Sequence, residues 1–164
     1  MEEILEKIED LKKQQEQLVF QDFQEETAWV IGSRIREQAV EKNYPVTISI
    51  TLGRRRLFYC SMPGTAPIND DWIRRKENTV YKFHKSSYEM SLYMQLKQDE
   101  IGRRYGLDCA EYAAAGGAVP LILKNSGVVG AVTVSGLAEN EDHDLVVGVI
   151  KDYLSARAVL KPDK

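Results

Sequence analysis

Two segments of the sequence carry groups that can bind an anionic ligand. The first is the basic run Arg74-Arg75-Lys76, where the planar guanidinium of arginine can bind a carboxylate or a phosphate through two hydrogen bonds. Successive helical residues point about 100° apart, so the three cations cannot all face one ligand. We take Arg74 and Lys76 as candidate ligand-binding residues. The alternative is a solvated helix face.

The second segment is Ser135-Gly136, which follows an apolar run at the predicted start of a helix. Free backbone N–H groups at a helix N-terminus favour anions, so Ser135 and Gly136 are candidates to hold an anion or a carbonyl oxygen. The neighbouring residues lack the Gly-Lys-Ser/Thr of a Walker loop and the spaced glycines of a dinucleotide-binding motif. Glycines that allow close packing of strands are the alternative interpretation.

His143 lies in an acidic run at residues 139–144 and is the candidate general acid or base as well as a ligand-binding candidate. The other histidine, His84, belongs to a distant basic segment, and Cys60 and Cys109 form no Cys-x-x-Cys. We therefore predict no metal site. Acids in a first helical turn also complement the helix dipole, which explains the run without a function.

Hydrophobic period and turn residues predict the elements that position these groups. Helices are expected at residues 2–18, 24–42, 69–85, 86–97 and 139–156. Strands are expected as two hairpins, at residues 46–52, 56–62, 119–124 and 127–135. Asn69 or Asp70 is expected to cap the third helix, and Ser86 or Ser87 the fourth. This order predicts an α+β fold, with an antiparallel sheet of four to five strands flanked by helices.

Composition limits the domain organisation and the class of partner. The 164 residues carry a net charge of -3, which argues against a general nucleic-acid binder, and contain no apolar run long enough to span a membrane. We expect residues 1–18 to be an amphipathic helix, either an arm or packed on its own chain, and residues 19–164 to be one domain. The first 26 residues are net acidic and residues 54–104 are net basic, a split that suits self-association or capture of an anion.

Several motifs together resemble the GlcG/HbpS-like superfamily, which is often labelled the haem-degrading domain family. They are Pro63-Gly64-Thr65, Trp72-Ile73-Arg74-Arg75-Lys76, Gly116-Gly117-Ala118-Val119-Pro120, residues 127–137 and Glu141-Asp142-His143. The resemblance covers residues 20–156 and is strongest to a short intracellular branch, in which membership does not imply a reaction. It implies a profilin-like α-β-α sandwich and homo-oligomers, and it makes haem the candidate cofactor. It transfers no axial ligand onto this sequence.

These observations favour a cytoplasmic, homo-oligomeric binding protein for haem or a small organic anion. The start of the sequence lacks the pattern of a signal peptide, which separates it from the secreted relatives that gave the superfamily its haem label. One alternative is a protein-interaction scaffold or chaperone-associated assembly factor. The other is a small-metabolite enzyme in which His143 acts as acid and base and Ser135-Gly136 holds an oxyanion.

Overall fold

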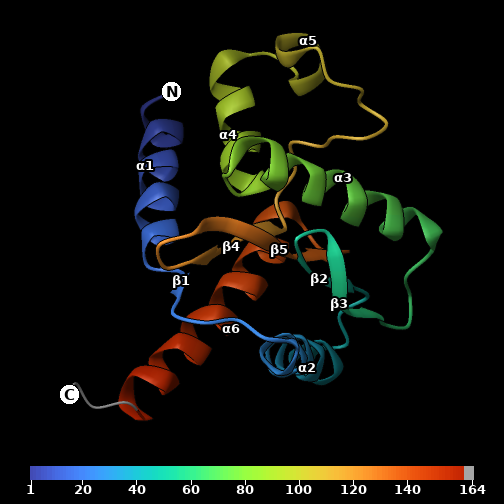
Figure 1. Cartoon of the computed structure of the whole chain (residues 1–164). Helices are drawn as coiled ribbons and strands as arrows, with labels where there is room; N and C mark the ends of the chain where they lie inside the picture. The colour runs from blue at the N-terminus through green and yellow to red at the C-terminus, as the bar shows by residue number, and fades with distance from the viewer. Residues whose placement is uncertain (161–164) are drawn as a thin grey trace.

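The helices and hairpins expected from the sequence are present, with bounds that differ by a few residues. A computed structural model describes residues 1–160 of the chain (Figure 1). The helices are α1 (Glu2–Glu16), α2 (Glu25–Lys42), α3 (Pro67–Phe83), α4 (Ser87–Lys97), α5 (Ile101–Tyr105) and α6 (Glu139–Leu160). The strands are β1 (Val19–Phe20), β2 (Thr47–Leu52), β3 (Arg55–Ser61), β4 (Ala118–Leu123) and β5 (Gly127–Ser135).

The five strands form one sheet in the order β1-β4-β5-β2-β3. The two hairpins are adjacent because β5 pairs antiparallel with β2. The four hairpin strands pair antiparallel as expected, and a fifth strand, β1, is added parallel to β4 at one edge. Neither the two-residue β1 nor the five-residue α5 was predicted, because segments this short do not complete a recognisable hydrophobic period.

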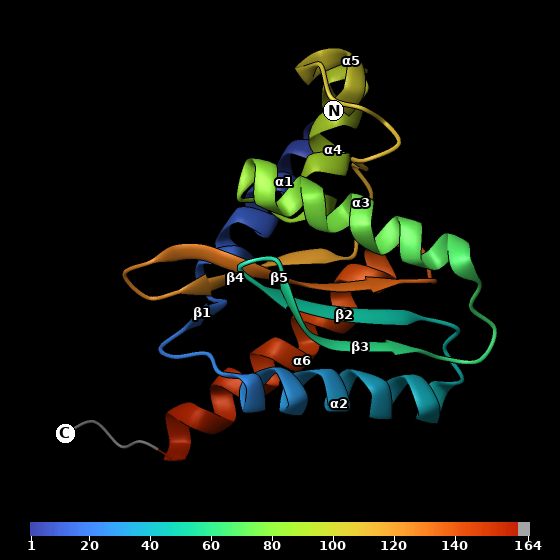
Figure 2. The ribbon, with the colours of Figure 1, turned by 45° about the vertical axis from the view of Figure 1, so that its right-hand side comes forward.

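Helices cover both faces of the sheet, so the expected α+β fold with a flanked sheet is confirmed. Figure 2 shows α3 on one side and α2 with α6 on the other. Strand β2 explains the division, since its apolar residues Ile48 and Ile50 alternate with the hydroxyl residues Thr47, Ser49 and Thr51. The two sets point to opposite faces, so β2 presents apolar side chains to α2 and α6 and hydroxyl groups to α3.

The apolar side holds the main core. Ile48 and Ile50 lie in one buried cluster with Ile31 and Ile35 of α2 and Ile150 of α6, all fully buried. Val132 and Val134 of β5 belong to the same cluster. The side chains that the sequence places at helical spacing in residues 24–42 are therefore the ones that cover the sheet.

The polar side packs against α3 through hydrogen bonds. Ser49 Oγ donates to Glu77 Oε1 at 2.5 Å, and the hydroxyl groups of Thr51 and Tyr81 are 2.8 Å apart. Burial raises the pKa of the Glu77 carboxyl above its ordinary value, although the Ser49 hydrogen bond opposes this. This side therefore carries buried polar groups that must be satisfied in pairs.

The start of α3 differs from the prediction. The helix begins at Pro67 after Ala66, and Asn69 lies inside the first turn, where its Oδ1 accepts a hydrogen bond from the Ala66 backbone N–H at 2.9 Å. Proline is well suited to a first helical position because its missing N–H is not needed there. The expected cap at Ser86 is confirmed, since its Oγ accepts from the Glu89 N–H at 3.1 Å.

Helix α1 packs against α4 rather than against the sheet. Ile8 and Leu11 are buried against Leu92, and α1 lies beside α4 in both views (Figures 1 and 2). Gln15 also donates from its side chain to the His84 carbonyl oxygen at 3.1 Å. Within residues 1–160, no helix is both long and apolar enough to span a membrane.

Candidate functional site

Lys76, a predicted ligand-binding residue, lies on the buried side of α3. Its side chain is 5% exposed, and Nζ donates to the Val134 carbonyl oxygen at 3.2 Å and to Asp142 Oδ2 at 3.1 Å. Lys76 therefore links three elements, α3, β5 and α6. The partner residues are separated from it by 58 and 66 positions in the sequence, so no local pattern could have indicated them.

Backbone N–H groups around Gly136 do form an anion cradle, and the chain's own Asp142 occupies it. Asp142 Oδ1 accepts from Leu137 N at 2.9 Å, and Oδ2 accepts from Gly136 N at 3.3 Å. The expectation that this turn binds an anion is thus met by a carboxylate from the first turn of α6. An external anion would have to displace Asp142 to use the same donors.

The Lys76–Asp142 pair is buried enough that each charge depends on the other. Burial lowers the pKa of Lys76, and the neighbouring Asp142 charge partly opposes that shift. Burial likewise raises the pKa of Asp142, opposed by Lys76 and by the two backbone donors. Both shifts favour the neutral forms, so a proton can move from the ammonium to the carboxylate without changing the charge of the pair.

The glycine pair Gly116-Gly117 makes room for this arrangement. A Cβ on Gly117 would lie 2.2 Å from the Val134 carbonyl oxygen and 2.9 Å from Lys76 Nζ, and one on Gly116 would lie 2.3 Å from the backbone oxygen of Glu139. Both contacts are too short for any side chain. The Gly-Gly motif therefore allows the start of α6 and the tip of Lys76 to approach the chain before β4.

Glu139 and Asp142 are the two residues of this site that sequence reasoning missed. Glu139 Oε2 accepts from Ser91 Oγ at 2.8 Å and from the Gly116 N–H at 3.1 Å, which ties α4 to α6. The sequence showed both acids in a first helical turn, where the helix dipole accounts for them. Their separate roles depend on contacts with α3 and α4.

A cavity of about 350 Å³ opens beside this pair. Two predicted residues besides Lys76, namely Ser135 and Gly136, lie on its wall, and the remaining lining residues are Asn69, Trp72, Ala115, Leu137, Glu139 and Asp142. We call it the Lys76 cavity. It contains one cation and two carboxylates, so its charge suits a neutral ligand better than a free anion.

Arg74 points away from that cavity, as expected for neighbours on a helix. Its guanidinium pairs with Asp71 at 2.8 Å and Glu111 at 3.5 Å, and it also donates to the Ala110 carbonyl oxygen at 3.2 Å. These contacts lie on an exposed surface. Arg74 and Lys76 therefore do not converge on one ligand in this fold.

His143 is buried between α6, α1 and α4. Its Nε2 lies 2.7 Å from Gln14 Oε1, and its ring centroid is 5.2 Å from that of Tyr88. Burial lowers the pKa of His143 from 6.5 to about 4. The ring lines none of the five cavities described for residues 1–160, so the structure does not bring His143 together with Ser135 or Lys76.

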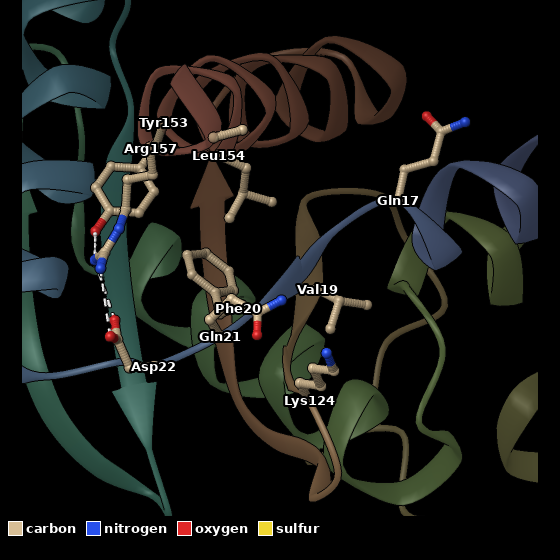
Figure 3. Close-up of a pocket in the computed structure, with 10 residues that line it drawn as sticks. Gln17, Val19, Phe20, Gln21, Asp22, Lys124, Tyr153, Leu154 and Arg157 are labelled. Atoms are coloured by element: carbon tan, nitrogen blue, oxygen red, sulfur yellow. Dashed lines mark hydrogen bonds and ion pairs between the residues drawn. The ribbon is translucent and has the colours of Figure 1, made fainter. Parts of the chain in front are cut away.

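The largest described cavity lies elsewhere, between β1, the end of β4 and the C-terminal half of α6, and has a volume of about 750 Å³. We call it the β1–α6 cavity. Figure 3 shows Val19, Phe20 and Leu154 as its apolar lining residues, with Lys124 below Val19 and Gln17 above. The sequence did not indicate this cavity, because β1 is too short to predict.

One side of the β1–α6 cavity is formed by a hydrogen-bonded row of three side chains. Arg157 lies between Tyr153 and Asp22 in Figure 3, donating to the tyrosine oxygen at 2.8 Å and pairing with the carboxylate at 3.1 Å. With Lys124, the cavity has two cations and one carboxylate. Its charge and apolar wall thus suit an organic anion.

A third cavity, of about 580 Å³, is the one with a histidine in its wall. His84 ends α3, and the cavity runs from there past α1 and α4 to the sheet edge; its other residues are Lys12, Gln15, Glu16, Val19, Phe83, Lys85, Glu89 and Ile122. We call it the His84 groove. The groove offers haem a histidine for its iron, apolar walls and two lysines for its propionates, and the two glutamates of the lining balance the charge of those lysines. The β1–α6 cavity fits haem less well, because its one aromatic oxygen already accepts from Arg157.

Residues 23–151, most of the chain, match the family model described as haem degrading protein HbpS-like. The chain belongs to this HbpS-like family. A UPF0303 protein of Acidobacterium capsulatum is 43% identical to it over 84% of this chain and 84% of that protein. The resemblance expected from the Gly-Gly and Trp-Ile-Arg-Arg-Lys motifs is therefore confirmed.

Solved structures agree with the fold of this HbpS-like chain. The Ybr137w protein superposes with a TM-score of 0.82 at 30% identity, covering 94% of this chain and 90% of that one. A structure described as a PduOC:heme complex has a TM-score of 0.61 at 20% identity, covering 73% of this chain and 86% of that one. The second likeness shows the fold alone.

Proposed function

We propose that this HbpS-like chain is a cytoplasmic, homo-oligomeric binding protein for a small organic anion. The observation that supports it best is the β1–α6 cavity, which is lined by the apolar residues Val19 and Leu154 together with the cations Lys124 and Arg157. An apolar wall contributes most of the affinity for such a ligand, and a few polar groups orient it. Arg157 is held in place by Asp22 and Tyr153, so its guanidinium is already ordered before a ligand binds.

Titration with anilinonaphthalene sulfonate, a fluorescent anion with an aromatic body, tests this site. We expect saturable binding that weakens about tenfold in Arg157→Gln, since a hydrogen bond to a charged group contributes about 1.5–3 kcal/mol. Arg74→Ala is the matched control, because Arg74 is an arginine with carboxylate partners outside the cavity. Equal affinity in Arg157→Gln and the wild type, or a loss in Arg74→Ala instead, would contradict the β1–α6 site.

Haem is the second candidate ligand, and the His84 groove is the observation that favours it. His84 would supply the iron ligand, Phe83, Val19 and Ile122 the apolar contact, and Lys12 and Lys85 the partners of the propionates. Bound haem would supply iron-centred redox chemistry. The structure described as a PduOC:heme complex shares the fold of this chain, which makes haem a reasonable ligand to test.

Hemin titration separates this candidate from adventitious binding. We expect a saturable Soret band whose position shifts in His84→Ala, while iron-free protoporphyrin binds both proteins equally. His143→Gln is the control, because His143 is the remaining histidine and is buried away from the groove. A Soret band that is identical in His84→Ala and the wild type would exclude His84 as the iron ligand.

Self-association is supported by an exposed aromatic surface next to a free sheet edge. Trp29 of α2 is 63% exposed and lies 5.8 Å, ring to ring, from Phe58 of the edge strand β3. Large exposed aromatic residues are common in protein interfaces. We expect light scattering to give the mass of an oligomer, and a lower mass for Trp29→Glu. Tyr105→Glu, which replaces an exposed aromatic on α5, is the control and should keep the wild-type mass.

A further inference from the structure

The Lys76 cavity contains a primary amine in a setting unlike that of Lys82, the other lysine of α3. Lys76 Nζ is buried, lies at the wall of a cavity, and has a carboxylate 3.1 Å away. We propose that Lys76 reacts with a small aldehyde or ketone in this cavity to form an imine, with Asp142 accepting and returning the proton. This site is separate from the β1–α6 cavity and the His84 groove, so it does not rest on the binding function proposed above.

The position of the amine supports nucleophilic attack from the cavity. Nζ is fixed by two hydrogen bonds, to the Val134 carbonyl and to Asp142, which leave the third N–H direction without a protein acceptor in the described residues. Lysine amines act as covalent nucleophiles when burial keeps part of them neutral. Burial does lower the pKa of Lys76, in agreement with the geometry.

Asp142 is placed to carry the proton. Its Oδ2 accepts from Lys76 Nζ, so it can take the proton that the ammonium must lose before attack. The backbone donors Leu137 and Gly136 hold the carboxylate in one orientation. Because burial also raises the pKa of Asp142, the protonated carboxyl is an accessible intermediate form.

The reaction balances within this pair. The ammonium gives one proton to Asp142; the free amine attacks the carbonyl carbon, and a C–N bond forms while the C=O π bond breaks. The amine nitrogen then loses its remaining protons to the former carbonyl oxygen, one of them through Asp142, and that oxygen leaves as water. The product is a neutral imine, or its protonated form with the original proton, and no oxidant or reductant is consumed.

The surroundings select the kind of carbonyl compound. Two carboxylates, Asp142 and Glu139, lie at a cavity of about 350 Å³, so a small neutral aldehyde or ketone is favoured over an oxo acid. Ser135 lines the same cavity and offers a hydroxyl for the carbonyl oxygen or for a hydroxyl group of the ligand. Trp72 provides a flat apolar side.

Reductive trapping tests the proposal on the full-length wild-type chain. The protein is incubated with glycolaldehyde and sodium cyanoborohydride near neutral pH, and peptide mass spectrometry measures the modification rate of each lysine. Lys82 is the internal control, since it is an exposed lysine on the same helix. We expect Lys76 to be modified several-fold faster than Lys82, because burial lowers the pKa of Lys76 and leaves more of its amine in the neutral, nucleophilic form near neutral pH. A rate for Lys76 equal to or below that of Lys82 would overturn the proposal.

The pH profile and one variant test the role of Asp142. The modification rate of Lys76 should reach half its maximum at a lower pH than that of Lys82, and this measurement needs no variant. In Asp142→Asn, folded as judged by circular dichroism, the maximal rate of Lys76 at alkaline pH should fall about a hundredfold, the lower end of the typical contribution of a positioned acid or base. An unchanged maximal rate in Asp142→Asn would exclude a role for Asp142 in the reaction. Identical pH profiles for Lys76 and Lys82 would contradict the proposal that Lys76 is the nucleophile.

Discussion

The two faces of the central sheet belong to the same strands but pack differently, one through apolar contacts and the other through buried polar groups. On β2, Ile48 and Ser49 are neighbours; Ile48 enters the apolar cluster under α2 and α6, whereas Ser49 donates to Glu77 of α3. The cluster on the apolar face consists of hydrophobic side chains, which gain stability from their removal from water. The polar face holds Lys76, Glu77 and Asp142 out of water, each with partners from other elements.

This difference indicates where chemistry is placed in the molecule. A buried ion pair contributes little net stability, because the loss of hydration offsets the attraction between the charges. An apolar replacement would therefore stabilise the fold about as well as the Lys76–Asp142 pair does. The pair lies beside a cavity that contains a primary amine and carboxylates, so the polar face combines reactive groups with space for a ligand.

The largest expected effect comes from breaking that pair on one side. Asp142→Ala leaves the Lys76 ammonium buried and two backbone donors without their acceptor, so we expect a loss of about 3–5 kcal/mol in the free energy of unfolding. Lys76→Met should cost less, because the Asp142 carboxylate keeps both backbone donors. Urea denaturation measures both. A greater loss in Lys76→Met would contradict this account of the pair.

The next effect is the acid sensitivity of the contact between α6 and α1. The pKa of His143 is about 4 in the folded chain against an ordinary 6.5, so the unfolded chain binds the proton more readily between these values. Stability should therefore fall by about 3 kcal/mol as the pH drops from about 6.5 to 4. Raised carboxyl pKa values, as at Asp142, contribute in the opposite direction. The contribution of His143 is therefore measured as the difference in the free energy of unfolding between the wild type and His143→Gln at each pH. A difference that does not change between pH 6.5 and 4 would exclude this contribution.

A small truncation on the hydroxyl side of β2 should lower the free energy of unfolding more than a small truncation on its apolar side. Ser49→Ala removes the donor to Glu77 and leaves a buried carboxyl without that hydrogen bond, which we expect to cost about 1–3 kcal/mol. Thermal unfolding followed by circular dichroism measures the loss. Glu77→Gln in the Ser49→Ala background should recover part of it, since the amide is neutral; no recovery would argue against desolvation as the cause.

The smallest effect is expected at the adjacent residue on the apolar face. Ile48→Val removes one methylene group from a fully buried site and should cost about 0.5–1.5 kcal/mol. The comparison of the two faces predicts that this loss is smaller than that of Ser49→Ala and independent of pH. A larger loss of stability in Ile48→Val than in Ser49→Ala would contradict the expectation that the polar face is the more sensitive to truncation.

Local patterns were sufficient for most elements of the fold. The alternation of β2 predicted both its faces, and Ser86 was found as the cap of α4, because these signals arise within a few residues. Asn69 was misplaced because its side chain bonds the backbone of Ala66 from inside the helix rather than from its start. Neither β1 nor the β1–α6 cavity could be predicted, since both depend on pairing with β4 across about 100 residues of chain.

Within the candidate site, the sequence by itself determined which residues carry charge and where the glycines lie, whereas the contacts that require Gly116 and Gly117 come from the tertiary structure. The sequence placed Lys76 on a helix, Ser135-Gly136 at a turn and His143 in an acidic first turn. Only the tertiary structure decided that the Asp142 carboxylate occupies the backbone donors at Gly136 and that Lys76 pairs with Asp142. It also decided that His143 lies against Gln14 of α1 and not at the Lys76 cavity. The physical reason is that a side chain's local period sets the direction in which it points, whereas its partner is set by the packing of helices and strands far apart in the chain.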